Sequence, residues 1–305
     1  MKQTFSILIS LLAICLLVRC DDKDFGEPHD ERIPVLLSFE NIAHTKVSED
    51  TNWWETSDRI GIFMINSGTS FDIQNIEPTH MKNKIFLLQW GSFEPMYMDT
   101  TFYVPQSVVD FIAYYPWQDN NTVMIPNEYK YFEIDLSDQQ KSHLDLLYSN
   151  NATHIDKEKS RNKVDLVFEH VLSKIEVEVS AGIEITDASV SEIELHGIYR
   201  KGNFLLANGK IENVNSKGMT VLKERTIPGL YRAFIIPQGG EEYLLRIILQ
   251  NGDVFVYNFP AGTKFEQGKI HTYYITVNKT GINVTNNNIT PWIGKDVDPI
   301  EDKVN

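Results

Sequence analysis

The sequence predicts an all-β protein built from antiparallel β-sandwiches, and three observations indicate this fold class. Apolar and charged residues alternate in many short segments, as in residues 174–180, where Ile175, Val177 and Val179 are separated by charged residues. This period of two is typical of half-buried strands. Glycine, proline, asparagine and aspartate stand between the segments, as they do in turns. Long helical patterns do not alternate with the strands, which favours sandwiches over a parallel α/β sheet.

The first half of the chain contains six segments with a strand pattern, namely residues 33–40, 59–65, 84–90, 101–105, 110–116 and 130–136. The best candidate for a helix follows them in residues 137–149. Ser137 can serve there as an N-cap, and Leu144, Leu147 and Tyr148 fall on one side. This pattern predicts one or two helical turns at most.

The second half adds further strands and two predicted hairpins. Residues 231–249 predict a hairpin that turns through residues 237–240. Residues 242–259 predict another around Asn251 and Gly252, because an Asn-Gly pair adopts positive φ at little cost. The remaining strands are residues 174–180, 191–197 and 269–285, the last with Tyr273, Ile275 and Val277 on one face.

The N-terminal residues have the pattern of an export signal. Lys2 precedes an apolar run over residues 5–18, which is shorter than the roughly 20 residues that span a bilayer. The run ends near Cys20, which favours a lipoprotein signal in which Cys20 is acylated and becomes the first mature residue. Arg19 stands where a small residue normally precedes the cut. An uncleaved or ordinarily cleaved signal is therefore the alternative.

The chain is predicted to have five parts. About 285 mature residues exceed what one small core usually organises, so two domains are expected. The polar run of residues 149–163 is the best linker, and the boundary is placed inside it. The parts are a signal peptide at residues 1–19, a charged linker at 20–32, an N-terminal sandwich at 33–158, a C-terminal sandwich at 159–292 and an acidic tail at 293–305.

Charge and cysteine usage exclude several classes of function. The formal net charge is −14, and removal of residues 1–19 takes away Lys2 and Arg19 and leaves 26 basic against 42 acidic residues, or −16. A chain this acidic repels phosphate backbones, so we expect no nucleic-acid partner. Cys15 and Cys20 are the two cysteines of the sequence. Disulfides, cysteine-ligated zinc and cysteine nucleophiles are thus excluded from the mature fold.

The sequence contains no phosphate loop, dinucleotide fingerprint, nucleophile elbow or zincin motif. Its eight histidines stand singly, and His170 in a strand-rich segment is interpreted as a packed histidine. We therefore expect no catalytic residue, no metal and no cofactor, and a binding or structural protein rather than an enzyme. Four tryptophans are candidates for stacking on sugars, with core filling as the favoured interpretation: Trp53, Trp54, Trp90 and Trp117.

Six segments resemble, in the same order, the fimbrillin family of Bacteroidota, which forms the subunits of lipoprotein-derived pili. They are residues 54–65, 110–117, 145–149, 166–179, 232–238 and 290–292, with Ser57 where the family often has glycine. The resemblance implies two transthyretin-like Greek-key β-sandwiches in tandem. It also implies a precursor that is anchored to outer-membrane lipid through Cys20 and carried to the cell surface, with residues 21–24 as the charged export tag.

The resemblance further implies assembly by strand exchange. In polymerising members a trypsin-like protease removes the first strand of the N-terminal sandwich, and a strand of the next subunit fills the groove. Residues 33–42 would be that strand here, with Val35, Leu37 and Phe39 on one face. The cut would fall at Lys46, where the family has arginine.

The leading prediction is therefore a stalk, accessory or tip subunit of a surface fimbria, acting in adhesion or biofilm formation. Its partners would be other fimbrial subunits, in a homo- or heteropolymer, and a ligand on a host or bacterial surface. The alternative is a monomeric, lipid-anchored binding module for glycans that keeps its first strand. An enzyme with a buried carboxylate pair in a cleft is a more distant third.

Overall fold

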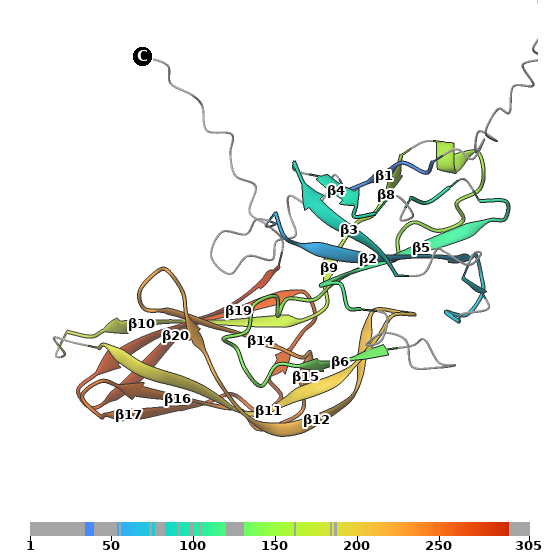
Figure 1. Cartoon of the computed structure of the whole chain (residues 1–305). Coiled ribbons are helices and arrows are strands. Elements are labelled where there is room, and N and C mark those ends of the chain that lie inside the picture. Colours follow the sequence, from blue (N-terminus) through green and yellow to red (C-terminus); the bar gives the residue numbers. More distant parts are fainter. Residues whose placement is uncertain are drawn as a thin grey trace, which may run out of the picture. The chain divides into compact units, whose positions relative to one another are not determined.

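The computed structural model describes residues 34–39, 54, 56–72, 75–76, 83–90, 92–97, 101–103, 105–119, 131–161, 163–183, 185 and 188–292, without the side chains of residues 285–287. It is an all-β structure with three main sheets (Figure 1). Within these ranges, helical structure is limited to the short 3-10 turn η4 (Lys159–Arg161) and a 3-10 position at Asn75. No helix in the described ranges has the length and apolar composition needed to cross a bilayer.

The first main sheet has six strands in the order β4-β3-β2-β5-β7-β9. In that order they are β4 (Ser92–Pro95), β3 (Lys84–Gln89), β2 (Arg59–Asn66), β5 (Val109–Tyr115), β7 (Leu147–Ser149) and β9 (Glu169–His170). Neighbours in this sheet are antiparallel throughout.

The other two main sheets face each other (Figure 1). One has the order β13 (Lys223–Glu224), β14 (Leu230–Ile235), β10 (Ser173–Ala181), β19 (Lys269–Asn278) and β20 (Gly281–Pro291). The second consists of β12 (Lys210–Val221), β11 (Val190–Leu205), β16 (Leu244–Leu249) and β17 (Val254–Asn258), with β6 (Tyr131–Asp135) paired to the far end of β11. Two small pairs complete the fold: β1 (Leu37–Ser38) with β8 (Val164–Asp165), and β15 (Gln238–Gly239) with β18 (Lys264–Phe265).

The six-stranded sheet is buried on both faces, which explains the almost continuous apolar run of β2. One face packs against residues 34–39, Phe102 and side chains from residues 152–168. The opposite face packs against β6, the end of β11 and Trp292. Gly61 lies at a close approach within this sheet, because a Cβ atom there would overlap the Tyr114 ring.

The second core lies between the sheets that contain β10 and β11. Alternate residues of each strand point into it, so that Ile175 and Val177 of β10 meet Ile193 and Leu195 of β11. The predicted apolar face of β19 is confirmed, since Tyr273, Ile275 and Val277 are all buried. This period-two burial is the pattern that predicted the strands.

The hairpin predicted at Asn251 and Gly252 is confirmed, because β16 and β17 pair directly across it. The hairpin predicted through residues 237–240 is wrong. Its two strands, β14 and β16, belong to different sheets, and residues 238–239 pair instead with β18. A turn signal indicates a change of direction but does not decide which sheet the next strand joins.

Two further expectations need correction. Residues 137–149 form no helical turn; they form turns and bends followed by β7. Gln139 is buried there and bonds the backbone of Leu136 and Phe234, which holds the segment in an irregular path. The pairing is also not wholly antiparallel, because β10 and β19 run parallel, as do β1 and β8.

Strand pairing crosses the predicted domain boundary in both directions. β8 and β9, which follow residue 159, pair with β1 and β7, whereas β6 pairs with β11. Residues of the predicted linker also pack on the first sheet, where the Phe111 amide donates to the Ala152 carbonyl at 2.8 Å. The division at residues 158 and 159 stays a prediction about folding units.

Candidate functional site

The first candidate site is the groove that holds residues 34–39, which we call the plug segment. Its backbone is bonded on both sides. The Val35 amide donates to the Phe102 carbonyl at 2.8 Å on one side. On the other side, the amides of Val164 and Leu166 donate to the carbonyls of Leu36 and Ser38, both at 2.9 Å. Without the plug segment, the carbonyl of Phe102 on one side and the amides of Val164 and Leu166 on the other would lose these backbone partners.

The side chains of the plug segment alternate between core and solvent. Val35 and Phe39 are buried and Leu37 is partly buried in the first core, whereas Leu36 is 59% exposed. The Phe39 ring lies 5.5 Å from Phe93, measured between ring centroids. Burying side chains of this kind stabilises the fold by about 1.5–3 kcal/mol each. An empty groove would therefore be strongly unfavourable.

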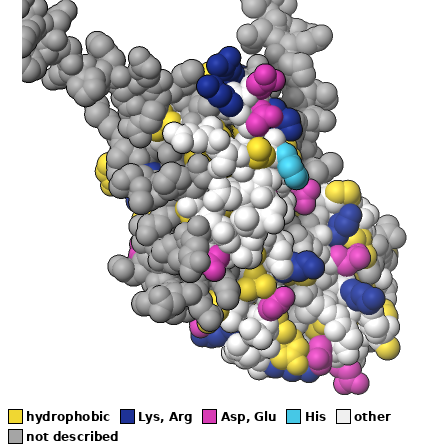
Figure 2. Space-filling view, turned by 90° about the vertical axis from the view of Figure 1, so that its right-hand side faces the viewer, with side chains coloured by type: hydrophobic (Ala, Val, Ile, Leu, Met, Phe, Trp, Pro, Cys, Tyr) yellow, Lys and Arg dark blue, Asp and Glu magenta, His cyan; other side chains and the backbone are white. Residues whose placement is uncertain are grey.

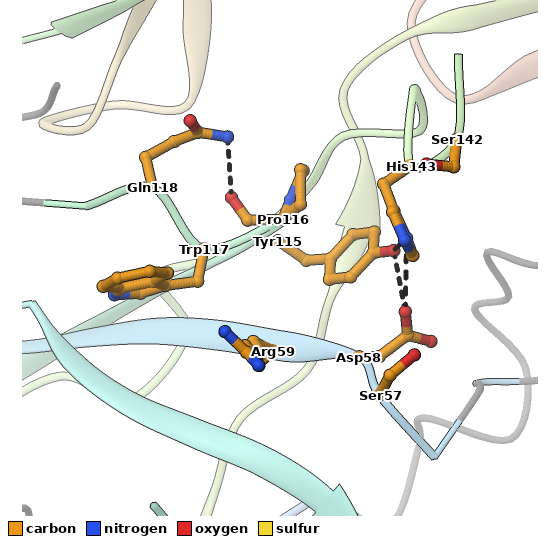
Figure 3. Close-up of a pocket in the computed structure, with 9 residues that line it drawn as sticks. All are labelled: Ser57, Asp58, Arg59, Tyr115, Pro116, Trp117, Gln118, Ser142 and His143. Atoms are coloured by element: carbon orange, nitrogen blue, oxygen red, sulfur yellow. Dashed lines mark hydrogen bonds and ion pairs between the residues drawn. The ribbon is translucent and has the colours of Figure 1, made fainter. Parts of the chain in front are cut away.

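The second candidate site is an open pocket of about 530 Å³ at the start of β2, which we call the Arg59 pocket. The described residues that line it come from three segments, residues 57–59, 115–118 and 142–143 (Figure 3). β2 and β5 bring the first two segments together because they are paired neighbours, and the Trp117 amide donates to the Arg59 carbonyl at 2.9 Å.

A chain of hydrogen bonds lies at one side of this pocket. The Tyr115 hydroxyl donates to Asp58 Oδ1 at 2.9 Å and lies 2.7 Å from His143 Nδ1. The one proton of the hydroxyl points to Asp58, so His143 bonds the tyrosine oxygen as a donor, with its proton on Nδ1. The neutral imidazole then has Nε2 as an acceptor. Asp58 is 1% exposed, so its charge is covered from solvent.

A second group of bonds connects Gln118, one of the lining residues, to Tyr114 of β5. The Tyr114 hydroxyl donates to Asn83 Oδ1 at 2.7 Å, and the Gln118 amide donates to the Tyr114 oxygen at 3.2 Å. Burial raises the pKa of Tyr114 well above its ordinary value, so the hydroxyl keeps its proton. Residues 116–118 are thus fixed before any ligand arrives.

The surface outside this pocket is mixed in charge. Figure 2 shows Asp and Glu side chains interspersed with Lys and Arg on one face, with hydrophobic side chains singly or in small groups. Described residues on that face therefore present no broad apolar patch.

Comparison with known proteins identifies the family of the chain. The sequence profile of the fimbrillin-like family matches residues 45–292. The chain belongs to the fimbrillin-like family. A Bacteroides uniformis protein described as a candidate fimbrium subunit, Fim1C, is 27% identical over 304 residues, covering 92% of each chain.

Solved structures share the fold of this fimbrillin-like chain. A candidate cell adhesion protein from Bacteroides uniformis matches with a TM-score of 0.67 at 21% identity, over 86% of this chain and 99% of that one. The tip fimbrial protein Mfa3 from Porphyromonas gingivalis matches with a TM-score of 0.50 at 12% identity, over 78% of this chain and 95% of that one.

The predicted site residues of the fimbrillin-like chain fall in different places. Cys20, Lys46 and Trp53 lie outside the described residues. Val35, Leu37 and Phe39 lie together against the first core, as their alternation predicted.

The three candidate tryptophans that the structure describes take separate roles. Trp54 packs against the first core, with its ring edge-on to Phe93 and Tyr115. Trp90 is 99% exposed at the turn between β3 and β4. Trp117 lines the Arg59 pocket. These three tryptophans belong to different segments of the described structure, so each one must be tested separately as a sugar contact.

Sequence reasoning missed the bonded group of Asp58, Tyr115 and His143. The first two residues lie in segments that resemble the family, but the chemistry of the group depends on His143, which no spacing connects to them. His170 is buried as expected, and its Nδ1 lies 3.0 Å from Asp145 Oδ1 while its ring stacks on Trp292 at 3.7 Å.

Proposed function

We propose that the chain is a structural subunit of a surface fimbria, acting in adhesion or biofilm formation, and that it assembles by strand exchange at the plug groove. Membership of the fimbrillin-like family supports the fimbrial role. The names of the relatives, a candidate fimbrium subunit and a tip fimbrial protein, are consistent with a stalk, accessory or tip position. The sandwiches would be the tandem transthyretin-like Greek-key domains that the sequence predicts.

The observation that carries the assembly step is the way the plug segment is held. It is bonded through main-chain groups on both sides, and alternate side chains enter the core. A strand of another subunit with apolar residues at every second position can make the same contacts. Main-chain bonds would then supply affinity, and the alternate side chains would set the register.

A cut at Lys46 would separate the plug segment from the rest of the chain. In the sequence, Lys46 stands between Phe39, which is buried in the groove, and Trp54, which packs against the first core. After the cut, non-covalent contacts alone would hold residues 34–39. Cys20, acylated at the outer membrane, would anchor the precursor until that step.

Limited trypsin digestion of the purified chain tests the proposal. We expect a cut at Lys46, loss of the plug segment and a ladder of oligomers on an unheated SDS gel. Lys46→Gln should abolish the cut and the ladder, whereas Lys157→Gln, at an exposed lysine, should leave both unchanged. A ladder that persists in Lys46→Gln would exclude activation at this residue.

The alternative is a lipid-anchored binding module that keeps the plug segment in place. The Arg59 pocket favours this second function, because an open pocket with polar groups and an aromatic side chain suits a small ligand. A stable monomer after cleavage at Lys46 would support the binding module and oppose the strand-exchanging subunit.

A further inference from the structure

We propose that the Arg59 pocket binds a sugar that carries a carboxylate, such as a hexuronic or sialic acid residue of a glycan. The pocket volume of about 530 Å³ falls within the usual range for small ligands. This site does not depend on strand exchange, so it can exist in a fimbrial subunit or in a monomeric binding module.

The guanidinium of Arg59 supplies the charge selectivity. Arg59 is exposed and makes no hydrogen bond or ion pair through its side chain within the described part of the chain. In Figure 3 it is seen between the Trp117 indole and the Asp58 carboxyl group. An arginine fork donates two parallel bonds to a carboxylate, which makes this pairing stronger than neutral hydrogen bonds.

The acidic group in the pocket does not oppose an anionic ligand directly. Asp58 is 1% exposed and its Oδ1 accepts a hydrogen bond from the Tyr115 hydroxyl at 2.9 Å, so a ligand has little direct access to this carboxylate. Arg59 is thus the exposed full charge among the described lining residues. The protein as a whole has a net charge of −14, so this exposed cation gives the pocket a local preference for an anionic ligand.

The other lining groups suit sugar hydroxyls. In the neutral ring with the proton on Nδ1, which lies 2.7 Å from the Tyr115 hydroxyl, His143 offers Nε2 as an acceptor. Ser57, Ser142 and the Gln118 amide add groups that both donate and accept. Hydroxyls of a sugar also do both, whereas the side chain of an acidic peptide has no ring of hydroxyls to match them.

Trp117 supplies an apolar surface beside these groups. Its indole is half-buried at the pocket wall, and its backbone is held by the bond to the Arg59 carbonyl. The C–H face of a pyranose can stack on such a ring while the carboxylate meets the guanidinium. The combination of indole, guanidinium and hydroxyl-binding groups selects an acidic sugar over a bare anion.

Binding of methyl α-D-galacturonoside to the purified chain, measured by calorimetry, tests the proposal, with methyl α-D-galactoside as the neutral match. We expect the uronoside to bind at least about tenfold more tightly than the galactoside, because only its carboxylate can accept the pair of charge-assisted hydrogen bonds from Arg59. Arg59→Gln should remove that difference. Arg161→Gln, at an exposed arginine of η4, should preserve it.

A second variant separates sugar binding from anion binding. Trp117→Leu should weaken both sugars by a similar factor, with thermal unfolding used to confirm that the variant is folded. Acetate and a short peptide with a free carboxyl terminus should bind at least about tenfold more weakly than the uronoside. Equal binding of the two sugars, full binding by Arg59→Gln, or a peptide that binds as tightly as the uronoside would each overturn the proposal.

Discussion

Trp54 meets Tyr115 edge-on, with the ring centroids 5.0 Å apart and the ring planes at 82°. The same indole lies 4.9 Å from Phe93, and Phe93 lies 5.5 Å from Phe39 of the plug segment. Aromatic contacts thus run from the plug groove to the Tyr115 hydroxyl at the side of the Arg59 pocket. Trp54 connects the two candidate sites, because its ring contacts Phe93 on one side and Tyr115 on the other.

Replacement of Trp54 by alanine is expected to destabilise the fold by about 3 kcal/mol, because truncation leaves a cavity beside the rings of Phe93, Tyr115 and Phe168. Urea unfolding measures this change in the free energy of unfolding. Trp90→Ala is the matched control, since the Trp90 side chain is 99% exposed. It should change stability by no more than about 0.5 kcal/mol. Equal effects of the two substitutions would contradict the packing role of Trp54.

Phe39→Ala is expected to loosen the plug segment without unfolding the sheets. The lost ring leaves a gap beside Phe93, so the segment should leave the groove more often. The amides of Val164 and Leu166 donate to plug carbonyls, and their hydrogen exchange reports each opening. We expect exchange at both amides to accelerate by at least about tenfold, as a loss of more than 1.4 kcal/mol requires.

Leu36→Ala is the control for that experiment. Leu36 is 59% exposed, but its carbonyl makes the same type of backbone bond, to the Val164 amide at 2.9 Å. Exchange at Val164 should therefore stay close to that of the unaltered chain. If Phe39→Ala also left both amides as protected as before, side-chain burial would not be what retains the plug segment.

Much of the fold was predictable because local signals agree with the tertiary structure. The turn at Asn251 and Gly252 joins two strands that are neighbours in space, so a local turn signal was sufficient. The turn at residues 237–240 is also indicated by glycines, but it passes between sheets, a choice decided by core packing far along the chain. For the same reason, the alternation of residues 33–40 indicated a buried face but not the parallel partner β8.

The Arg59 pocket was beyond sequence reasoning for a related reason. Asp58 and Tyr115 become neighbours through the pairing of β2 with β5, and His143 joins them from an irregular segment for which helical turns were predicted. Its φ of 58° lies in the left-handed region, which a helical pattern does not indicate. Long-range pairing and one unusual backbone conformation together create the site.

The pH dependence of stability should contain a contribution from His271. Its side chain is buried, and burial lowers its pKa below the ordinary value, with the Glu266 carboxylate acting weakly in the opposite direction. The Glu266 amide lies 3.4 Å from His271 Nε2, an arrangement that requires the neutral ring as acceptor. The unfolded chain takes up a proton near pH ~6.5, while the folded chain resists it. The unfolding free energy should therefore fall as pH decreases through that value.

Urea midpoints measured between about pH 8 and about pH 5.5 check this expectation. His271→Gln should show a shallower decline than the unaltered chain, because glutamine has no proton to gain and its amide oxygen can still accept from Glu266. His154→Gln, at an exposed histidine, should keep the original slope. The slope is the relevant quantity, since His271→Gln can be less stable at every pH. An unchanged slope in His271→Gln would show that acid sensitivity in this range comes from other groups.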